Sequence, residues 1–237
     1  CSKNKRIYAL NSDGSVQFNY NTGKYLIGTP VIGNIDDDSD MEVVIGSYMS
    51  PTSTNKIYAI NPDGSDVPGF PITIGEKINR GVGMADFNSN GKLDIVVGTD
   101  SENIYLIYDN GTIASGFPFE GDGDFRSEPT IVDYQGEKLI FSGTKNGTLF
   151  AINSLGESVF SIETSDDVLV SPSVLFHDLP IIFFGNNDGQ VHAVDINGIT
   201  LDGWPISLES EIVSSIAFSD LVSDENPEII VTTEDGT

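Results

Sequence analysis

The sequence predicts an all-β β-propeller of five four-stranded blades, and two kinds of repeat carry this prediction. The first repeat is a strand-like segment rich in Ile, Tyr, Phe and Val. The second is an acidic nine-residue loop followed by an apolar run and Gly. Helical periodicity of useful length is not found. The strand-like segment recurs about every 42–50 residues, at residues 5–10, 56–60, 103–107, 148–152 and 190–194.

One unit can be followed in order from residue 83 to residue 118. Residues 83–85 are predicted as the inner strand, the acidic loop comes next, and residues 94–98 form the second strand. Residues 104–108 form the third strand. The turn Asp109-Asn110-Gly111 then leads to a fourth strand. Because Asn-Gly and Asp-Gly supply the positive φ that two-residue hairpin turns need, each unit is predicted to be a β-meander.

The fourth strands are expected to carry a Gly-aromatic-Pro segment. Proline lacks the backbone N–H that a ladder needs, so these strands are predicted to be outer edges. Radially placed meanders with short, protected outer edges form a propeller. The segments are Gly69-Phe70-Pro71, Gly116-Phe117-Pro118 and Gly203-Trp204-Pro205.

The two ends of the chain are expected to share one blade. The chain begins at a third strand, residues 5–10, and reaches a second strand, residues 228–232, near its end. Joining them gives four continuous blades and one composite blade, and it removes two free sheet edges that invite pairing with other chains. Residues 1–237 are therefore interpreted as a single propeller domain. The alternative is a five-unit piece of a longer propeller.

Two of the acidic loops have the ligand spacing of a calcium site. Calcium takes about six to eight oxygen ligands, which alternate side chains of a tight loop, one backbone carbonyl and water can supply. In the second loop the ligands are Asp86, Asn88, Asn90, the Lys92 carbonyl and Asp94. In the first loop they are Asn34, Asp36, Asp38, the Asp40 carbonyl and Glu42. We therefore expect Ca²⁺ at both loops.

A third loop keeps this spacing only in part. Asp220, Asp224 and Glu228 are placed as ligands, but Val222 stands where another ligand is expected. This site is predicted to be weaker or empty. Loops 133–136 and 176–179 lack the pattern and are predicted to be plain turns.

The second loop with its trailing Ile95-Val96-Val97-Gly98, the matching residues 34–46 and the Gly-Phe-Pro segments resemble the FG-GAP or VCBS repeat family. These are calcium-binding propellers related to the integrin α-subunit head. The resemblance is close in two repeats and loose in three, and the chain has fewer predicted blades than is usual in the family. It implies an extracellular or cell-surface binding propeller.

Composition limits the partners. With 36 acidic and 11 basic residues the formal charge is −25, which repels phosphate backbones and argues against nucleic acid. A membrane span is not expected, because apolar stretches of about 18 residues are absent. Cys1 is the single cysteine, so an intrachain disulfide is excluded. We expect a secreted or cell-surface monomer or module of a larger protein, with a periplasmic location or a lipid anchor on Cys1 as further options.

The loops that enter inner strands, and those that join second to third strands, are predicted to lie on one face, called the top face below. They combine aromatic residues, Arg and carboxylates, which is the composition of a binding face, although ordinary loop variety also accounts for it. The candidate ligand-binding residues are Tyr25, Tyr48, Arg80, Phe125, Arg126 and Glu128.

Two functions remain open. The leading hypothesis is a calcium-stabilised binding or adhesion module that engages a protein or glycan through the top face. The alternative is a carbohydrate-active enzyme, a glycosidase or polysaccharide lyase, that uses a central funnel. A glycosidase needs two carboxylates about 5–9.5 Å apart. Near the starts of inner strands only Glu128 stands out, so catalytic residues are not assigned and binding is preferred.

Overall fold

The computed structural model describes residues 4–176, 178–224 and 226–236, which consist almost entirely of strands and turns. Among these residues the one helical element is the 3-10 turn η1 (Thr52–Thr54). The chain divides into two compact units, Cys1–Glu120 and Gly121–Thr237. The all-β class predicted from the sequence is confirmed.

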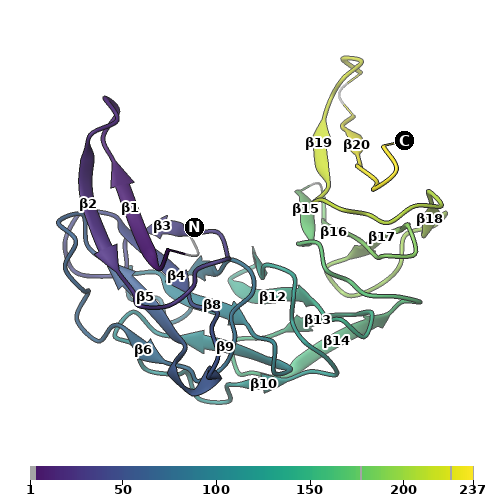
Figure 1. Cartoon of the computed structure of the whole chain (residues 1–237). Helices are drawn as coiled ribbons and strands as arrows, with labels where there is room; N and C mark the ends of the chain where they lie inside the picture. The colour runs from purple at the N-terminus through teal and green to yellow at the C-terminus, as the bar shows by residue number, and fades with distance from the viewer. Residues whose placement is uncertain (1–3, 177, 225, 237) are drawn as a thin grey trace. The chain divides into compact units, whose positions relative to one another are not determined.

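The first unit contains a hairpin and two four-stranded antiparallel meanders (Figure 1). The hairpin pairs β1 (Arg6–Leu10) with β2 (Val16–Asn21). The first meander consists of β3 (Val31–Gly33), β4 (Glu42–Gly46), β5 (Lys56–Ile60) and β6 (Ile72–Thr73). The second consists of β7 (Gly83–Ala85), β8 (Asp94–Gly98), β9 (Asn103–Ile107) and β10 (Phe119–Glu120).

The second unit has two more meanders and a final pair of strands. One meander consists of β11 (Thr130–Tyr134), β12 (Glu137–Gly143), β13 (Thr148–Ile152) and β14 (Ser158–Glu163). The other consists of β15 (Ser173–Phe176), β16 (Pro180–Gly185), β17 (Gln190–Asp195) and β18 (Ile206–Ser207). The chain then pairs β19 (Ala217–Ser219) with β20 (Glu228–Ile230).

The described part of the chain therefore holds four four-stranded meanders, in agreement with the four continuous blades expected. The composite blade from residues 5–10 and 228–232, and the single domain over residues 1–237, stay predictions.

The fourth strands differ from the prediction in their position. Gly69-Phe70-Pro71 precedes β6 instead of forming it. The Phe70 N–H donates to the Val67 carbonyl at 3.0 Å, and Gly69 has φ of +93°, so the segment is a turn before the strand. Gly116-Phe117-Pro118 and Gly203-Trp204-Pro205 form the same turn before β10 and β18. Proline is thus kept outside the ladder altogether.

The second and third strands of the meanders supply most of the buried core. Gly46, at the end of β4, lies directly against the fully buried Ile78 of the connector between β6 and β7. A Cβ added to Gly46 would stand 2.3 Å from Ile78 Cγ2. In the second unit, Gly143 packs in the same way on Val168 and Gly185 on Ile212. The Gly that closes the repeated apolar run is therefore a packing requirement.

A backbone hydrogen bond recurs at the residue just before each of these buried apolar side chains. The Tyr25 carbonyl accepts the N–H of Tyr48 at 2.8 Å, and Leu26 is the buried residue that follows. The equivalent pairs are Lys77 with Asp100, Asp124 with Lys145, Asp167 with Asn187, and Glu211 with Glu234, at 2.9–3.0 Å. In the four meanders each bond ties the entering connector to the residue two positions beyond the second strand, and the Glu211–Glu234 bond does the same to a residue four positions beyond β20.

Candidate metal centre

The first acidic loop joins β3 to β4 and brings three carboxylates together. One oxygen from each of Asp36, Asp38 and Glu42 lies within 4.8 Å of the others. The loop is a series of Asx-type turns. The Asp38 N–H donates to Asp36 Oδ1 at 3.0 Å, and the Asp40 N–H donates to Asp38 Oδ1 at 2.7 Å. These turns point alternate side chains toward the same place, as the sequence spacing predicts.

Glu42 is the buried member of this cluster, with no exposed surface. Its Oε2 accepts the N–H of Ile35 at 2.8 Å, but its buried Oε1 has no hydrogen-bond partner. Burial is the main cause that raises the pKa of Glu42, and the charges of Asp36 and Asp38 add to the effect. A buried carboxylate with an unpartnered oxygen beside two further carboxylates is destabilising unless a cation compensates the charge.

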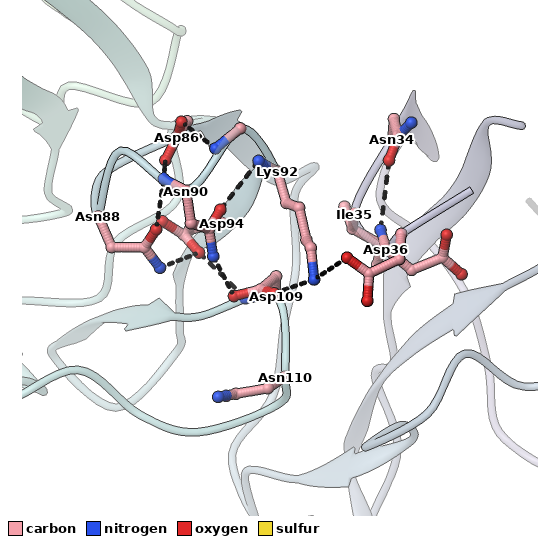
Figure 2. A network of polar contacts seen from close by, with 12 residues as sticks. Asn34, Ile35, Asp36, Asp86, Asn88, Asn90, Lys92, Asp94, Asp109 and Asn110 are labelled. Atoms are coloured by element: carbon pink, nitrogen blue, oxygen red, sulfur yellow. Dashed lines mark hydrogen bonds and ion pairs between the residues drawn. The ribbon is translucent and has the colours of Figure 1, made fainter. Parts of the chain in front are cut away.

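The second acidic loop joins β7 to β8 and forms a denser network (Figure 2). Asp86 accepts the N–H of Asn90 at 3.1 Å through Oδ1 and the N–H of Gly91 at 2.8 Å through Oδ2. Asn88 Oδ1 accepts the same Asn90 N–H at 3.1 Å. Asn90 Oδ1 accepts the Lys92 N–H at 2.9 Å. The side chains predicted as ligands therefore accept hydrogen bonds from the backbone N–H groups of the same loop, and these bonds fix its conformation.

Asp94 is the buried carboxylate of this second loop, and both its oxygens have donors. Oδ2 accepts the Phe87 N–H at 2.8 Å, and Oδ1 accepts the Asp109 N–H at 3.0 Å and Asn88 Nδ2 at 3.3 Å. Burial is the largest cause of its raised pKa, and the donors oppose that effect. Asp94 is therefore better compensated in the absence of a cation than Glu42.

The difference between the two loops has a local cause in the turn after the third strand. Counted from the strand pairs Val43–Ile60 and Ile95–Ile107, Pro62 occupies the position of Asp109. Proline has no N–H, so the donor that reaches Asp94 Oδ1 has no counterpart for Glu42 Oε1.

Asp109 was expected only as a turn residue, but in the structure its side chain also contacts the second acidic loop. Asn90 Nδ2 donates to Asp109 Oδ1 at 3.1 Å, and Lys92 Nζ lies 3.3 Å from Asp109 Oδ2. Lys92 Nζ also lies 2.8 Å from Asp37 Oδ1, which links the two loops. Unlike the ligand spacing, this link joins residues far apart in the sequence, so the loop pattern did not reveal it.

The third loop joins β19 to β20. The Leu221 N–H donates to Glu228 Oε2 at 2.6 Å, as the matching N–H does in the other loops, and the Asp224 N–H donates to Asp220 Oδ1 at 3.2 Å. Asp220 and Asp224 are exposed, and Val222 is 66% exposed. This loop keeps the turn geometry of the other two. Among its described residues it lacks a fully buried carboxylate, and Val222 replaces one of the ligands.

The two remaining loops are short. Gln135 and Gly136, with φ of +55° and +85°, form the turn between β11 and β12. The turn between β15 and β16 includes residue 177, which lies outside the described residues. In the described ranges, Asp36, Asp38 and Glu42 are the one group of three or more acidic, His or Cys side chains that could hold a metal.

The candidate ligand-binding residues are found in both units. In the first unit Tyr25 is 38% exposed, Tyr48 is half-buried and Arg80 is exposed. In the second unit Arg126 pairs with Asp124 at 3.3 Å, and the Glu128 N–H donates to Ser171 Oγ. The expectation for Phe125 is wrong, because Phe125 has no exposed surface. Its ring packs on the ring of Phe150, with 5.9 Å between the two ring centres. Its connector position is the one that Ile78 fills in the first unit.

Comparison with protein families gives one match. Residues 34–97, which contain both complete acidic loops, match the family described as FG-GAP-like repeat. The resemblance inferred from these loops is confirmed over that span. A search of curated proteins found no match.

Solved structures of similar fold cover nearly the whole chain. BamB from Moraxella catarrhalis has a TM-score of 0.72 and 16% identity over 100% of this chain and 66% of that chain. BBS1N, solved in complex with ARL6DN, has a TM-score of 0.67 and 13% identity over 98% and 70%. The V. cholerae biofilm matrix protein Bap1 has a TM-score of 0.69 and 14% identity over 97% and 38%. These likenesses support the β-propeller class. None of the helices described is long and apolar enough to cross a membrane.

Proposed function

Since residues 34–97 carry an FG-GAP-like repeat in a propeller-like chain, we propose that this protein is a calcium-stabilised binding module. Calcium would be held by the first loop through Asp36, Asp38 and Glu42, together with Asn34 and the Asp40 carbonyl. The observation that carries the proposal is the unpartnered, buried Oε1 of Glu42 in a cluster of three carboxylates.

The ion would sit in the loop that follows β3 and precedes β4, and it would hold the two strands together at that end of their ladder. A cation that binds only the folded state stabilises that state by mass action. Here it would also offset the repulsion among the three carboxylates. The role of calcium in this proposal is therefore structural, since it stiffens the scaffold that presents the top face.

The second loop would bind calcium through Asp86, Asn88, Asn90, the Lys92 carbonyl and Asp94. Because these groups already hydrogen-bond to one another, cation binding must displace some of those bonds. We expect the first loop to gain more stability from calcium than the second. The loop with Asp220, Asp224 and Glu228 would be weak or empty.

The proposed ligand is a protein or glycan bound by the top face, at a cell surface or outside the cell. Two neighbours in fold support parts of this proposal. BBS1N was solved in complex with ARL6DN, which supports a protein ligand, and Bap1 is a biofilm matrix protein, which supports a place outside the cell. The glycosidase or lyase alternative stays a prediction, because the carboxylates that the structure brings together belong to the acidic loop.

Titration calorimetry with CaCl₂ tests the metal part of this proposal. The wild-type chain should bind calcium, and Glu42→Gln should lose the tighter class of sites. Asp224→Asn is the matched control and should leave that class intact. Equal binding by wild type and Glu42→Gln would contradict the assignment to the first loop.

A glycan array and a cell-surface pull-down, each run with and without calcium, test the binding part. Ligand capture that depends on calcium supports the proposal. A chain that captures nothing under either condition contradicts it.

A further inference from the structure

Two lysine–tyrosine pairs form a row on the first unit, with a lysine at each end, which is unusual in a chain of net charge −25. Lys5 Nζ lies 5.5 Å from the centre of the Tyr25 ring. Lys77 Nζ lies 5.1 Å from the centre of the Tyr48 ring. The backbones of the two tyrosines are joined by the 2.8 Å hydrogen bond from Tyr48 to Tyr25. These four residues are called the cation–tyrosine row below.

The backbone on both sides of the row is fixed by further hydrogen bonds. The Lys5 carbonyl accepts the N–H and the hydroxyl of Thr22, at 3.0 and 2.9 Å. The Ile78 N–H donates to the Ser47 carbonyl at 3.1 Å, which sets Lys77 beside Tyr48. On binding a ligand, the residues of the row therefore lose less conformational freedom than residues of an unrestrained loop would lose.

Glu76 anchors the connector that carries Lys77. Its Oε2 accepts the Thr99 hydroxyl at 2.6 Å, and its Oε1 accepts the Tyr105 hydroxyl at 2.8 Å. The donors are Thr99, which directly follows β8, and Tyr105 of β9, so ion pairing with Lys77 is not needed to satisfy this carboxylate. The Lys77 ammonium is instead held over Tyr48.

Two more basic residues extend the row. Lys24 Nζ donates to the Thr54 hydroxyl of η1 at 2.5 Å. Arg80 is exposed, and its carbonyl would lie 2.1 Å from a Cβ added to Gly28, so its backbone lies against the segment that carries Tyr25. The Thr54 hydroxyl in turn donates to the Pro51 carbonyl at 3.0 Å, which fixes the position of the Lys24 ammonium, a further donor on the segment that carries Tyr25.

The distribution of charge along the sequence points to the same place. Residues 1–120 contain eight basic and 15 acidic residues, a net charge of −7. Residues 121–237 contain three basic and 21 acidic residues, a net charge of −18. An anionic ligand is therefore repelled by most of the chain and received best where the lysines gather.

We propose that the cation–tyrosine row binds an anionic glycan built of carboxylated sugars. This inference rests on the binding role proposed above and names the class of ligand. The ammonium groups of Lys5 and Lys77 would contact sugar carboxylates at the two ends. The Tyr25 and Tyr48 rings would pack against the C–H faces of the pyranose rings between them.

A glycan fits the row better than a peptide does. Protein ligands draw most of their binding energy from side chains buried in apolar pockets. On these connectors Leu26 and Ile78 are buried beneath the surface, and Ile27, which is 37% exposed, is a single aliphatic side chain and not an apolar pocket. What the row offers is aromatic rings, hydroxyl groups and ammonium groups. Those groups match a hydroxylated ligand that carries regularly spaced negative charges.

The test is calorimetry of the full chain with tetragalacturonate, at a constant millimolar calcium concentration. A short oligomer is used because long polyuronates bind calcium themselves. We expect binding that weakens steeply with added salt. The Lys5→Gln, Lys77→Gln double variant should lose about ten-fold or more in affinity, and Tyr48→Leu should lose several-fold. Lys138→Gln, which removes a lysine paired with Asp133 in the second unit, should bind like wild type.

Two further ligands decide the class. The carboxyl-reduced, neutral tetrasaccharide should bind at least ten-fold more weakly, and equal binding would overturn the role of charge. Tetraglutamate with an acetylated N-terminus and an amidated C-terminus carries the same four carboxylates. Tighter binding of that peptide would make the row an acidic-peptide site and overturn the glycan assignment. The salt dependence of the wild-type chain needs no variant, so a variant that fails to fold leaves the test intact.

Failure of this inference differs from failure of the proposed function. Capture of another ligand on the array, unchanged by Lys5→Gln and Lys77→Gln, would overturn the row as the site while the binding module stands. No capture at all would overturn both.

Discussion

Gly46 lies so close to Ile78 that no side chain fits between them, since an added Cβ would stand 2.3 Å from Ile78 Cγ2 and 2.7 Å from Ile78 Cβ. Ile78 is fully buried and cannot move aside into solvent. This contact joins the end of β4 to the connector that follows β6. The packing of one meander against the chain entering the next therefore depends on a missing methyl group.

Gly46→Ala should destabilise the protein by about 3 kcal/mol, because overpacking a buried contact forces backbone or rotamer shifts. Gly14→Ala is the control. Gly14 has φ of +85° and nothing within 4 Å of its added Cβ, so it should cost only about 1 kcal/mol of backbone strain. Urea unfolding measures both. Equal losses would mean that the core relaxes around the new methyl group.

Glu42→Gln should change stability in opposite directions with and without calcium. In EDTA it removes a buried charge with an unpartnered oxygen, and we expect stabilisation of about 1 kcal/mol or more at neutral pH. In millimolar calcium it removes a ligand and should destabilise. Thermal melts of both proteins under both conditions check this. A loss of stability under both conditions would contradict the proposal that the buried charge of Glu42 destabilises the calcium-free protein.

The same residue predicts a pH dependence in EDTA. The pKa of Glu42 is raised above the ordinary value of 4.5, so the ionised carboxylate penalises the folded state at every pH above its folded pKa. As pH falls through that pKa toward 4.5, protonation relieves the penalty. The melting temperatures of wild type and Glu42→Gln should therefore converge on acidification. A gap that stays constant down to pH 4.5 would show that charge is not responsible.

Removing calcium should lower the stability of the wild-type chain. A ligand present at 100 times its dissociation constant stabilises the folded state by about 2.7 kcal/mol, and extracellular modules bind calcium at roughly 0.1–1 mM. Melting in EDTA and in 10 mM calcium measures the difference. Magnesium at the same concentration is the control for ionic strength. Coincident melting temperatures in EDTA and calcium would exclude a structural calcium ion.

Asp94→Ala should cost more calcium affinity than Asp224→Ala. Asp94 is buried within a complete set of candidate ligands, whereas Asp224 is exposed in a loop where Val222 replaces a ligand. Titration calorimetry on both variants compares them. A larger loss at Asp224 would reverse the order of the two sites.

The composite blade can be tested by cross-linking. If residues 5–10 pair with residues 228–232, some cysteine pairs placed across those segments in a Cys1→Ser background should form disulfides, because bridged Cα atoms lie about 4.4–6.8 Å apart. Mass spectrometry after mild oxidation detects them. Pairs between β1 and β2, which are strand neighbours, are the positive control. Failure of every pair across the ends would favour a piece of a longer propeller.

Much of the fold follows from the sequence because its main signals are local. Alternating apolar strands, Asn-Gly and Asp-Gly turns and acidic loops depend on neighbours within a few residues. The inner strand at residues 83–85 and the second strand at residues 94–98 agree with β7 and β8. The fourth strands were misplaced because proline was assigned to an edge strand, whereas the structure keeps it in a turn.

The misses at the site have a different origin. Phe125 was taken for a surface aromatic because its neighbours are polar and charged, yet it fills the buried connector position. Alignment of the connectors would have revealed this, since Leu26, Ile78, Val168 and Ile212 mark the same position. Asp109 and Pro62 were missed for a comparable reason: their effect on Asp94 and Glu42 arises across the ladder between second and third strands.

The hydrogen bond between Tyr25 and Tyr48 uses backbone atoms alone, and it recurs where the side chains are Lys77 and Asp100. A bond of this kind is indifferent to the side chains on either residue. The side chains at these positions can therefore be substituted, which changes the chemistry of the surface, while the fold is maintained. A randomised library at these paired positions should retain folded members at high frequency, which makes the connectors a natural place for new recognition to arise by selection.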